Sequence, residues 1–113
     1  MGLFSRRSKR PPSDTPEGSA REARRATTQH LSQFVATRTG VEAYIEPPNS
    51  QTQTTILLIA TTGEWTRRKV PDAKAARQLA AELNIPVYDV NFTGYPQRFR
   101  DWNSAQARRQ PNR

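Results

Sequence analysis

Two short segments combine basic and aromatic residues in a way that could bind nucleic acid. Residues 65–69 read Trp-Thr-Arg-Arg-Lys, and residues 95–102 contain two arginines among Tyr95, Phe99 and Trp102. Aromatic rings with interleaved arginines hold unpaired bases and phosphates in RNA-binding proteins. The sequence therefore indicates a polyanion site whose cations are Arg67, Arg68, Lys69, Arg98 and Arg100.

The same segments allow two other interpretations. The aromatic side chains could belong to the core, with the long stems of the arginines lying along its rim. Residues 67–69 would then be a solvated strand face. Alternatively, a set of aromatic residues could form a site for a protein partner, and that set is Trp65, Tyr88, Tyr95 and Trp102.

The residues that common catalytic sites require are largely missing. Gly63 and Gly94 are isolated and are typical of turns rather than of a phosphate-binding loop. His30 is the only histidine, and Ser32 two positions away does not share its helix face. With no cysteine and one histidine, the chain has no evident metal cluster. We therefore expect no catalytic residue, metal or cofactor, and the sequence favours a protein that is not an enzyme over one that is.

Charge divides the chain into three parts. Residues 1–25 carry seven Arg or Lys against three acids, and residues 104–113 carry three Arg and no acid. Residues 26–103 hold eight basic and seven acidic side chains, with no spacing that selects an acid and base pair. We expect a basic disordered tail at 1–25, a folded domain at 26–103 and a second basic disordered tail at 104–113.

Hydrophobic periodicity predicts the elements of that domain. Apolar residues at three- and four-residue spacing predict helices at 20–38 and from 71 or 72 to 83. Alternating or continuous apolar runs predict strands, and a final helix begins near Pro96. The strands are expected at residues 41–46, 51–61, 64–70 and 86–90. The fold class is α+β, with the order α-β-β-β-α-β-α, a mixed four-stranded sheet and a parallel crossover between the last two strands.

Four segments of the sequence carry a resemblance to a known family. They are residues 40–47, 63–71, 85–89 and 94–101. Over roughly residues 27–103 the chain resembles a family of small uncharacterised actinobacterial proteins, some of which are labelled oxidoreductases. The chain has no dinucleotide fingerprint, flavin-type glycine loop or redox cysteine to match that label. The resemblance implies a bacterial cytosolic setting and carries over no active site.

The chain shows no signal for secretion or for a transmembrane segment. The basic residues after Met1 run into Pro11 and Pro12 without an apolar core, and the longest apolar run is Ile56 to Ala60. We therefore expect a cytoplasmic protein. Its expected function is non-enzymatic binding of a polyanion, with RNA or a ribonucleoprotein favoured. The alternative is a protein-interaction adaptor, and a third option is weak membrane association through Leu3 and Phe4.

Overall fold

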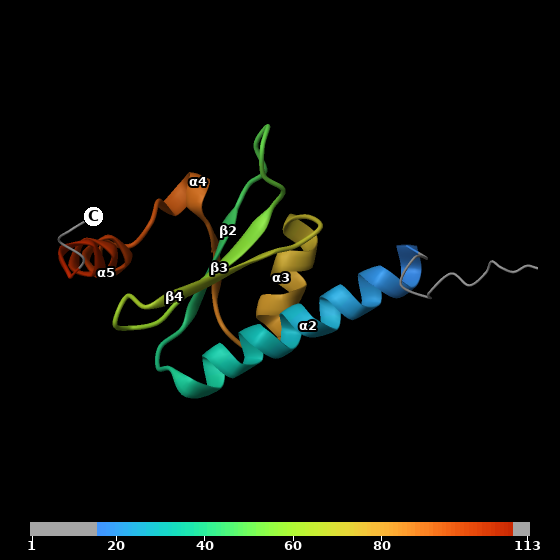
Figure 1. The fold of residues 1–113 in the computed structure, drawn as a ribbon, viewed down its shortest axis with the longest axis horizontal. Coiled ribbons are helices and arrows are strands. Elements are labelled where there is room, and N and C mark those ends of the chain that lie inside the picture. The colour runs from blue at the N-terminus through green and yellow to red at the C-terminus, as the bar shows by residue number, and fades with distance from the viewer. Residues whose placement is uncertain (1–15, 110–113) are drawn as a thin grey trace, which may run out of the picture.

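A mixed four-stranded sheet lies at the centre of the protein, with helices on both of its faces (Figure 1). The computed structural model describes residues 16–109, so the predicted tail residues 1–15 and 110–113 lie outside the described part. The elements in chain order are α2 (Pro16–Thr37), β2 (Glu42–Glu46), β3 (Thr55–Ile59), β4 (Trp65–Lys69), α3 (Ala73–Glu82), β5 (Val87–Asp89), α4 (Val90–Thr93) and α5 (Gln97–Arg108).

The sheet has the strand order β4-β3-β2-β5. β3 pairs antiparallel with both β2 and β4, and β5 pairs parallel with β2. Helix α3 carries the chain from β4 at one edge to β5 at the other, and these two edge strands run in the same direction. The α+β class, the mixed sheet and the predicted order of elements are confirmed. The structure adds α4, a single helical turn directly after β5.

The outer helices extend further than the predicted domain boundaries. α2 begins at Pro16, which suits the first turn of a helix because proline there loses no intrahelical hydrogen bond. An ion pair of 3.0 Å between Arg24 and Glu82 ties this part of α2 to the end of α3. At the other end, α5 continues to Arg108 through alanine, glutamine and arginine, which are good helix formers. Residues 16–25 and 104–108 are therefore helical.

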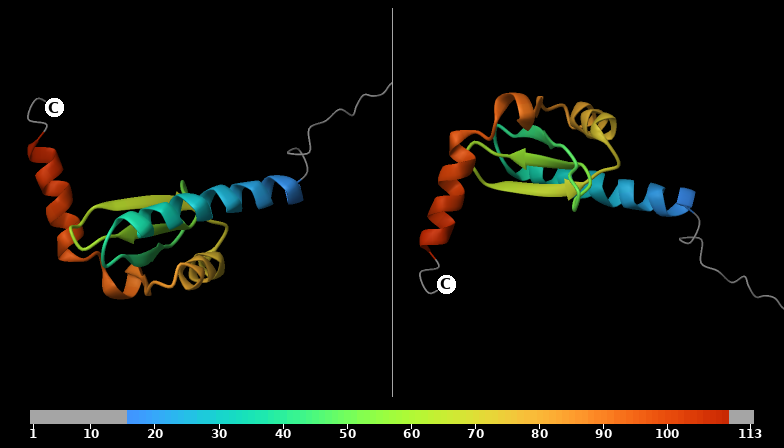
Figure 2. Two further views of the ribbon diagram at one scale, coloured as in Figure 1. Left: turned by 90° about the horizontal axis from the view of Figure 1, so that it is seen from below. Right: turned by 90° about the horizontal axis from the view of Figure 1, so that it is seen from above.

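One face of the sheet carries the larger core, beneath α2 and α3 (Figure 2). Side chains on a strand point alternately to opposite faces, so Ile56 and Leu58 of β3 face these helices while Leu57 and Ile59 face away. Leu31 of α2 and other fully or nearly buried aliphatic residues fill this layer. Both faces of β3 are buried, as expected for a central strand covered on two sides.

Helix α3 begins at the predicted position. Asp72 is its N-cap, and its carboxylate accepts a hydrogen bond of 2.8 Å from the backbone N–H of Ala75. The buried side of the helix consists of Ala76, Leu79 and Ala80. The helix ends near Asn84, whose left-handed backbone, with φ of 60°, turns the chain toward β5.

Candidate functional site

The predicted aromatic residues gather on the second face of the sheet, below α4 and the start of α5. Trp65 lies 5.7 Å from Phe99 between ring centroids, and Tyr95 stacks on Phe99 at 5.1 Å. Phe99 is buried, and Trp65 and Tyr95 pack against its cluster. Most of the surface of these three rings is therefore buried, in agreement with their interpretation as core residues.

Tyr88 and Phe92 are the exposed aromatic residues near this face. Tyr88, on β5, lies 5.4 Å from the buried Tyr44 and has 37% of its surface exposed. Phe92, on α4, is 88% exposed and is not among the aromatic residues predicted from the sequence to bind a partner. Because α4 is one turn long and has no hydrophobic periodicity, no pattern in the sequence marked the ring as exposed.

The turn between β3 and β4 holds α5 in place. The indole N–H of Trp65 donates a hydrogen bond of 2.8 Å to Oδ1 of Asn103. Gly63 has a φ of 96°, and a side chain there would collide with the carbonyl of Arg98 and with Cβ of Trp102. Glycine at this position therefore allows the close approach of α5, which also leaves Trp102 partly buried.

Glu46 organises the polar part of the second face. Its side chain is 13% exposed and accepts hydrogen bonds from Arg67 Nε at 2.7 Å and Arg67 Nη2 at 2.8 Å. Thr55 and Tyr95 donate their hydroxyls to the same carboxylate at 2.6 and 2.7 Å. Burial alone would raise the pKa of Glu46, but the bonds from Arg67, Thr55 and Tyr95 outweigh it and lower the pKa. Burial and the bond to Glu46 raise the pKa of Tyr95 to about 12.

Arg98 is engaged in a similar way by Glu42. Its guanidinium donates to Oε1 of Glu42 at 2.6 Å and to the backbone carbonyl of Ala60 at 2.9 Å. Tyr44 donates its hydroxyl to the same Glu42 oxygen at 2.9 Å. Burial opposes ionisation of Glu42, yet the bonds from Arg98 and Tyr44 hold its pKa below the usual value. A phosphate that approached Arg67 or Arg98 would compete with a partly buried carboxylate.

The five predicted cations do not form one surface. Arg68 points to the opposite side of β4 from Arg67, where its Nη2 lies 3.2 Å from Nδ1 of His30. Arg100 is exposed and donates to the carbonyl of Tyr95 at 2.8 Å. Within residues 16–109, no carboxylate forms an ion pair with Arg68, Lys69 or Arg100. Two of the predicted cations, Arg67 and Arg98, are therefore paired with carboxylates. The other three have no carboxylate partner among the described residues.

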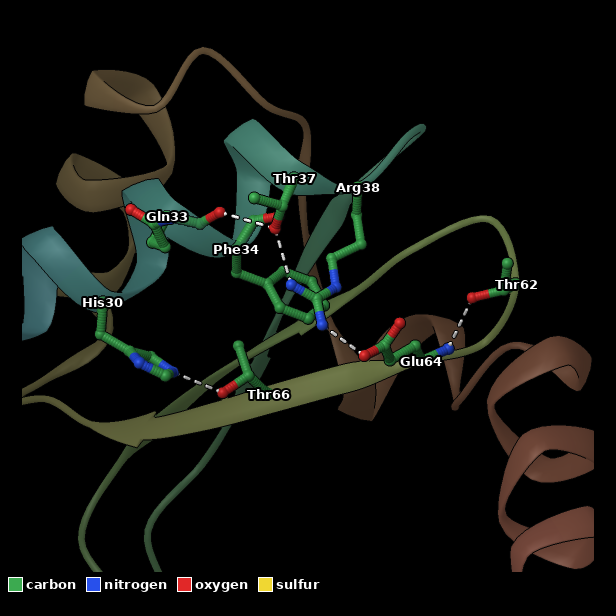
Figure 3. A network of polar contacts seen from close by, with 8 residues as sticks. All are labelled: His30, Gln33, Phe34, Thr37, Arg38, Thr62, Glu64 and Thr66. Carbon is green, nitrogen blue, oxygen red and sulfur yellow. Dashed lines mark hydrogen bonds and ion pairs between the residues drawn. The ribbon is translucent and has the colours of Figure 1, made fainter.

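His30 joins α2 to β4 and has no carboxylate partner within the described residues. Its Nε2 lies 2.7 Å from the hydroxyl of Thr66 (Figure 3). Burial and the nearby positive charge of Arg68 lower the pKa of His30. In the same network Arg38 pairs with Glu64 and lies 4.6 Å above the ring of Phe34. These contacts attach α2 to the sheet, and they include no nucleophile and base pair.

The outer side of α2 carries a basic recess that was not predicted from the sequence. The recess has a volume of about 650 Å³, and seven of its eight lining residues are polar, with no carboxylate among them. Its lining residues are Arg21, Arg24, Arg25, Thr28, Gln29, Ser32, Gln33 and Ala36. The three- and four-residue spacing of the arginines could have revealed this face, since such residues are neighbours on a helix. This basic face was not predicted because residues 1–25 were assigned to a tail.

Two further properties of residues 16–109 bear on function. No group of three or more His, Cys, Asp or Glu side chains in this part of the chain is arranged to hold a metal ion. Likewise, none of its helices has the length and apolar character needed to cross a membrane. Comparisons with protein-family models, curated proteins and solved structures found no match.

Proposed function

We propose that the protein is a non-enzymatic cytoplasmic binding module for a polyanionic partner, RNA or a ribonucleoprotein. The observation that supports this proposal most directly is the carboxylate-free recess along α2. Arg21 and Arg25 supply charge there, and Thr28, Ser32 and Gln29 supply uncharged donors. Arginine, serine, threonine and glutamine side chains are the usual contacts to the phosphates and sugars of nucleic acids.

The distribution of ion pairs favours α2 over the second face of the sheet. Arg67 and Arg98 hold partly buried carboxylates, whereas Arg21 and Arg25 are exposed and have no ion-pair partner within residues 16–109. Breaking an existing pair offsets part of the gain from a new phosphate contact. The four predicted tail cations, Arg6, Arg7, Lys9 and Arg10, precede α2 in the chain and would add sequence-independent attraction.

A charge-reversal experiment tests this proposal. The full-length protein would be titrated into fluorescein-labelled oligouridine at low and near-physiological salt, with binding followed by fluorescence anisotropy. We expect the double variant Arg21→Glu/Arg25→Glu to lose about tenfold or more in affinity. The slope of log affinity against log salt should also fall by about 0.7 for each lost phosphate contact.

The matched control is Arg108→Glu/Arg109→Glu, which makes the same change in net charge on the exposed end of α5. Equal losses in the two double variants would mean that only net charge matters, and the recess would be rejected as a site. If Arg68→Glu/Lys69→Glu caused the largest loss instead, the RNA site would lie on β4, as the sequence predicted.

A further inference from the structure

We infer that the outer edge of β4 is a docking site for an extended acidic segment of a partner protein, which would add a fifth strand to the sheet. β4 is the last strand on its side of the sheet, and α2 passes beneath it (Figure 2). Strand addition of this kind supplies backbone hydrogen bonds for affinity and side-chain contacts for specificity. The site lies on a different element from the α2 recess proposed to bind RNA, although Arg21 and Arg24 of that recess line one cleft together with Lys69.

The register of β3 and β4 shows which backbone groups point outward. Ala60 N–H donates to the Glu64 carbonyl at 2.8 Å, and Val70 N–H donates to the Thr54 carbonyl at 2.9 Å. In an antiparallel ladder such hydrogen-bonded pairs alternate with pairs that point away. The N–H and C=O groups of Trp65, Arg67 and Lys69 therefore face outward.

These outward amides are available for pairing. No acceptor within residues 16–109 takes a hydrogen bond from the amide of Trp65, Arg67 or Lys69. The outward carbonyl of Arg67 accepts a bond of 2.9 Å from Nη1 of Arg68. Arg68 is exposed, so an incoming strand can displace its side chain from this carbonyl at small cost.

The opposite edge of the sheet lacks these features. β5 has only three residues, and it follows Pro86, which has no N–H to donate. Helix α4 begins immediately after it at Val90. Short strands and flanking proline are devices that protect an edge from pairing. β4 has five residues and no proline within it or directly beside it, so the two edges differ in their capacity to accept a strand. Its cations discourage pairing with a like-charged strand but not with an acidic one.

Charge selects the kind of strand that fits. Arg68 and Lys69 are exposed and have no ion-pair partner among the described residues, and the side chains of an added strand would lie within about 5 Å of theirs. A second copy of β4 would place three cations beside three cations. The protein's own residues 1–15 carry four basic side chains and one acid, so they are also a poor match. An acidic partner segment complements this edge.

The probe for this site is a short, blocked, fluorescein-labelled peptide of alternating Glu and Val. Its affinity for the full-length protein would be measured by anisotropy at near-physiological salt. We expect binding to be lost when the central peptide amides are N-methylated, because that change removes backbone donors and leaves every charge in place. Equal binding of the methylated peptide would overturn the inference and reduce the contact to charge attraction.

A variant on β4 tests the same hydrogen bonds from the protein side. Lys69→Pro removes an outward N–H at an edge position that tolerates proline, and Lys69→Ala removes the charge but keeps that N–H. We expect Lys69→Pro to bind at least about tenfold more weakly than Lys69→Ala. Circular dichroism and thermal unfolding would establish that both variants fold. Equal affinity of the two folded variants would overturn the inference.

Amide hydrogen exchange of the unmodified protein supplies a readout that does not depend on any variant. The peptide should slow exchange at Arg67 and Lys69, while Thr66 and Arg68, which already pair with β3, should change little. Oligouridine should leave the exchange of all four amides unchanged. If oligouridine displaced the peptide and protected the same amides, β4 would be a polyanion site and the peptide inference would fail while RNA binding stood.

Discussion

The two faces of the sheet are held together by different kinds of interaction. On the helical face, β3 contributes Ile56 and Leu58 to an aliphatic layer under α2 and α3. On the second face, Leu57 joins a smaller cluster that is bordered by aromatic rings and by the carboxylates Glu42 and Glu46. Aliphatic burial is non-directional, whereas hydrogen-bonded ion pairs depend on geometry and on protonation. The second face should therefore respond to pH more strongly than the helical face.

Truncating two adjacent leucines compares the faces directly. Leu57 and Leu58 are both fully buried, but they lie in different clusters. We expect Leu58→Ala to lower the free energy of unfolding by about 4 kcal/mol and Leu57→Ala by about 2 kcal/mol. The reason is that neighbouring side chains relax less completely into a cavity in the larger layer. Urea denaturation measures both values. Equal losses would mean that the two faces contribute alike to stability.

The next largest effect is expected at Glu46. Glu46→Gln leaves the Arg67 guanidinium without its counter-charge and should lower the free energy of unfolding by about 2 kcal/mol. Because the pKa of Glu46 is lowered below 4.5 in the fold, its contribution is complete above pH 4.5 and is lost as the pH falls through the folded pKa. The variant should show a shallower loss of stability in that acidic range.

Glu82→Gln is the matched control for this variant. Glu82 pairs with Arg24 at the surface, and the two side chains are 50% and 54% exposed. Exposed pairs contribute less than about 1 kcal/mol because water screens them. Urea denaturation over a range of pH should therefore separate the two variants. Similar losses in both would show that Glu46 acts as an ordinary surface charge.

The sequence predicted the fold because its signals for helices and strands are local. Periodicity and turn residues are local signals, and they correctly indicated the element order and the central position of residues 56–59. The ends of α2 and α5 were placed less well, since polar helix formers carry no periodic apolar signal. The one-turn helix α4 is too short to have a period at all.

The partners of the arginines depend on long-range register, which no local pattern carries. The two-residue alternation of a strand places Trp65 and Arg67 on one side of β4. The contacts of Arg67 with Glu46 are set by the pairing of β2 with β3 and of β3 with β4, and the loop between α4 and α5 brings Tyr95 to the same carboxylate. Arg67, which the sequence presents as a free cation, therefore belongs to the hydrogen-bond network around Glu46.

The smallest effect is expected at His30, which lies on the helical face but is polar. Its pKa is lowered from 6.5 by burial and by Arg68, so the folded protein binds this proton less readily than the unfolded chain. Stability should fall slightly as the pH drops below 6.5, a window that lies above the one for Glu46. His30→Gln, which cannot titrate, should remove that slope when unfolding is measured between about pH 7 and pH 5. An unchanged slope in this variant would mean that other groups titrate there and that the contact between His30 and Arg68 does not couple α2 to β4 through charge.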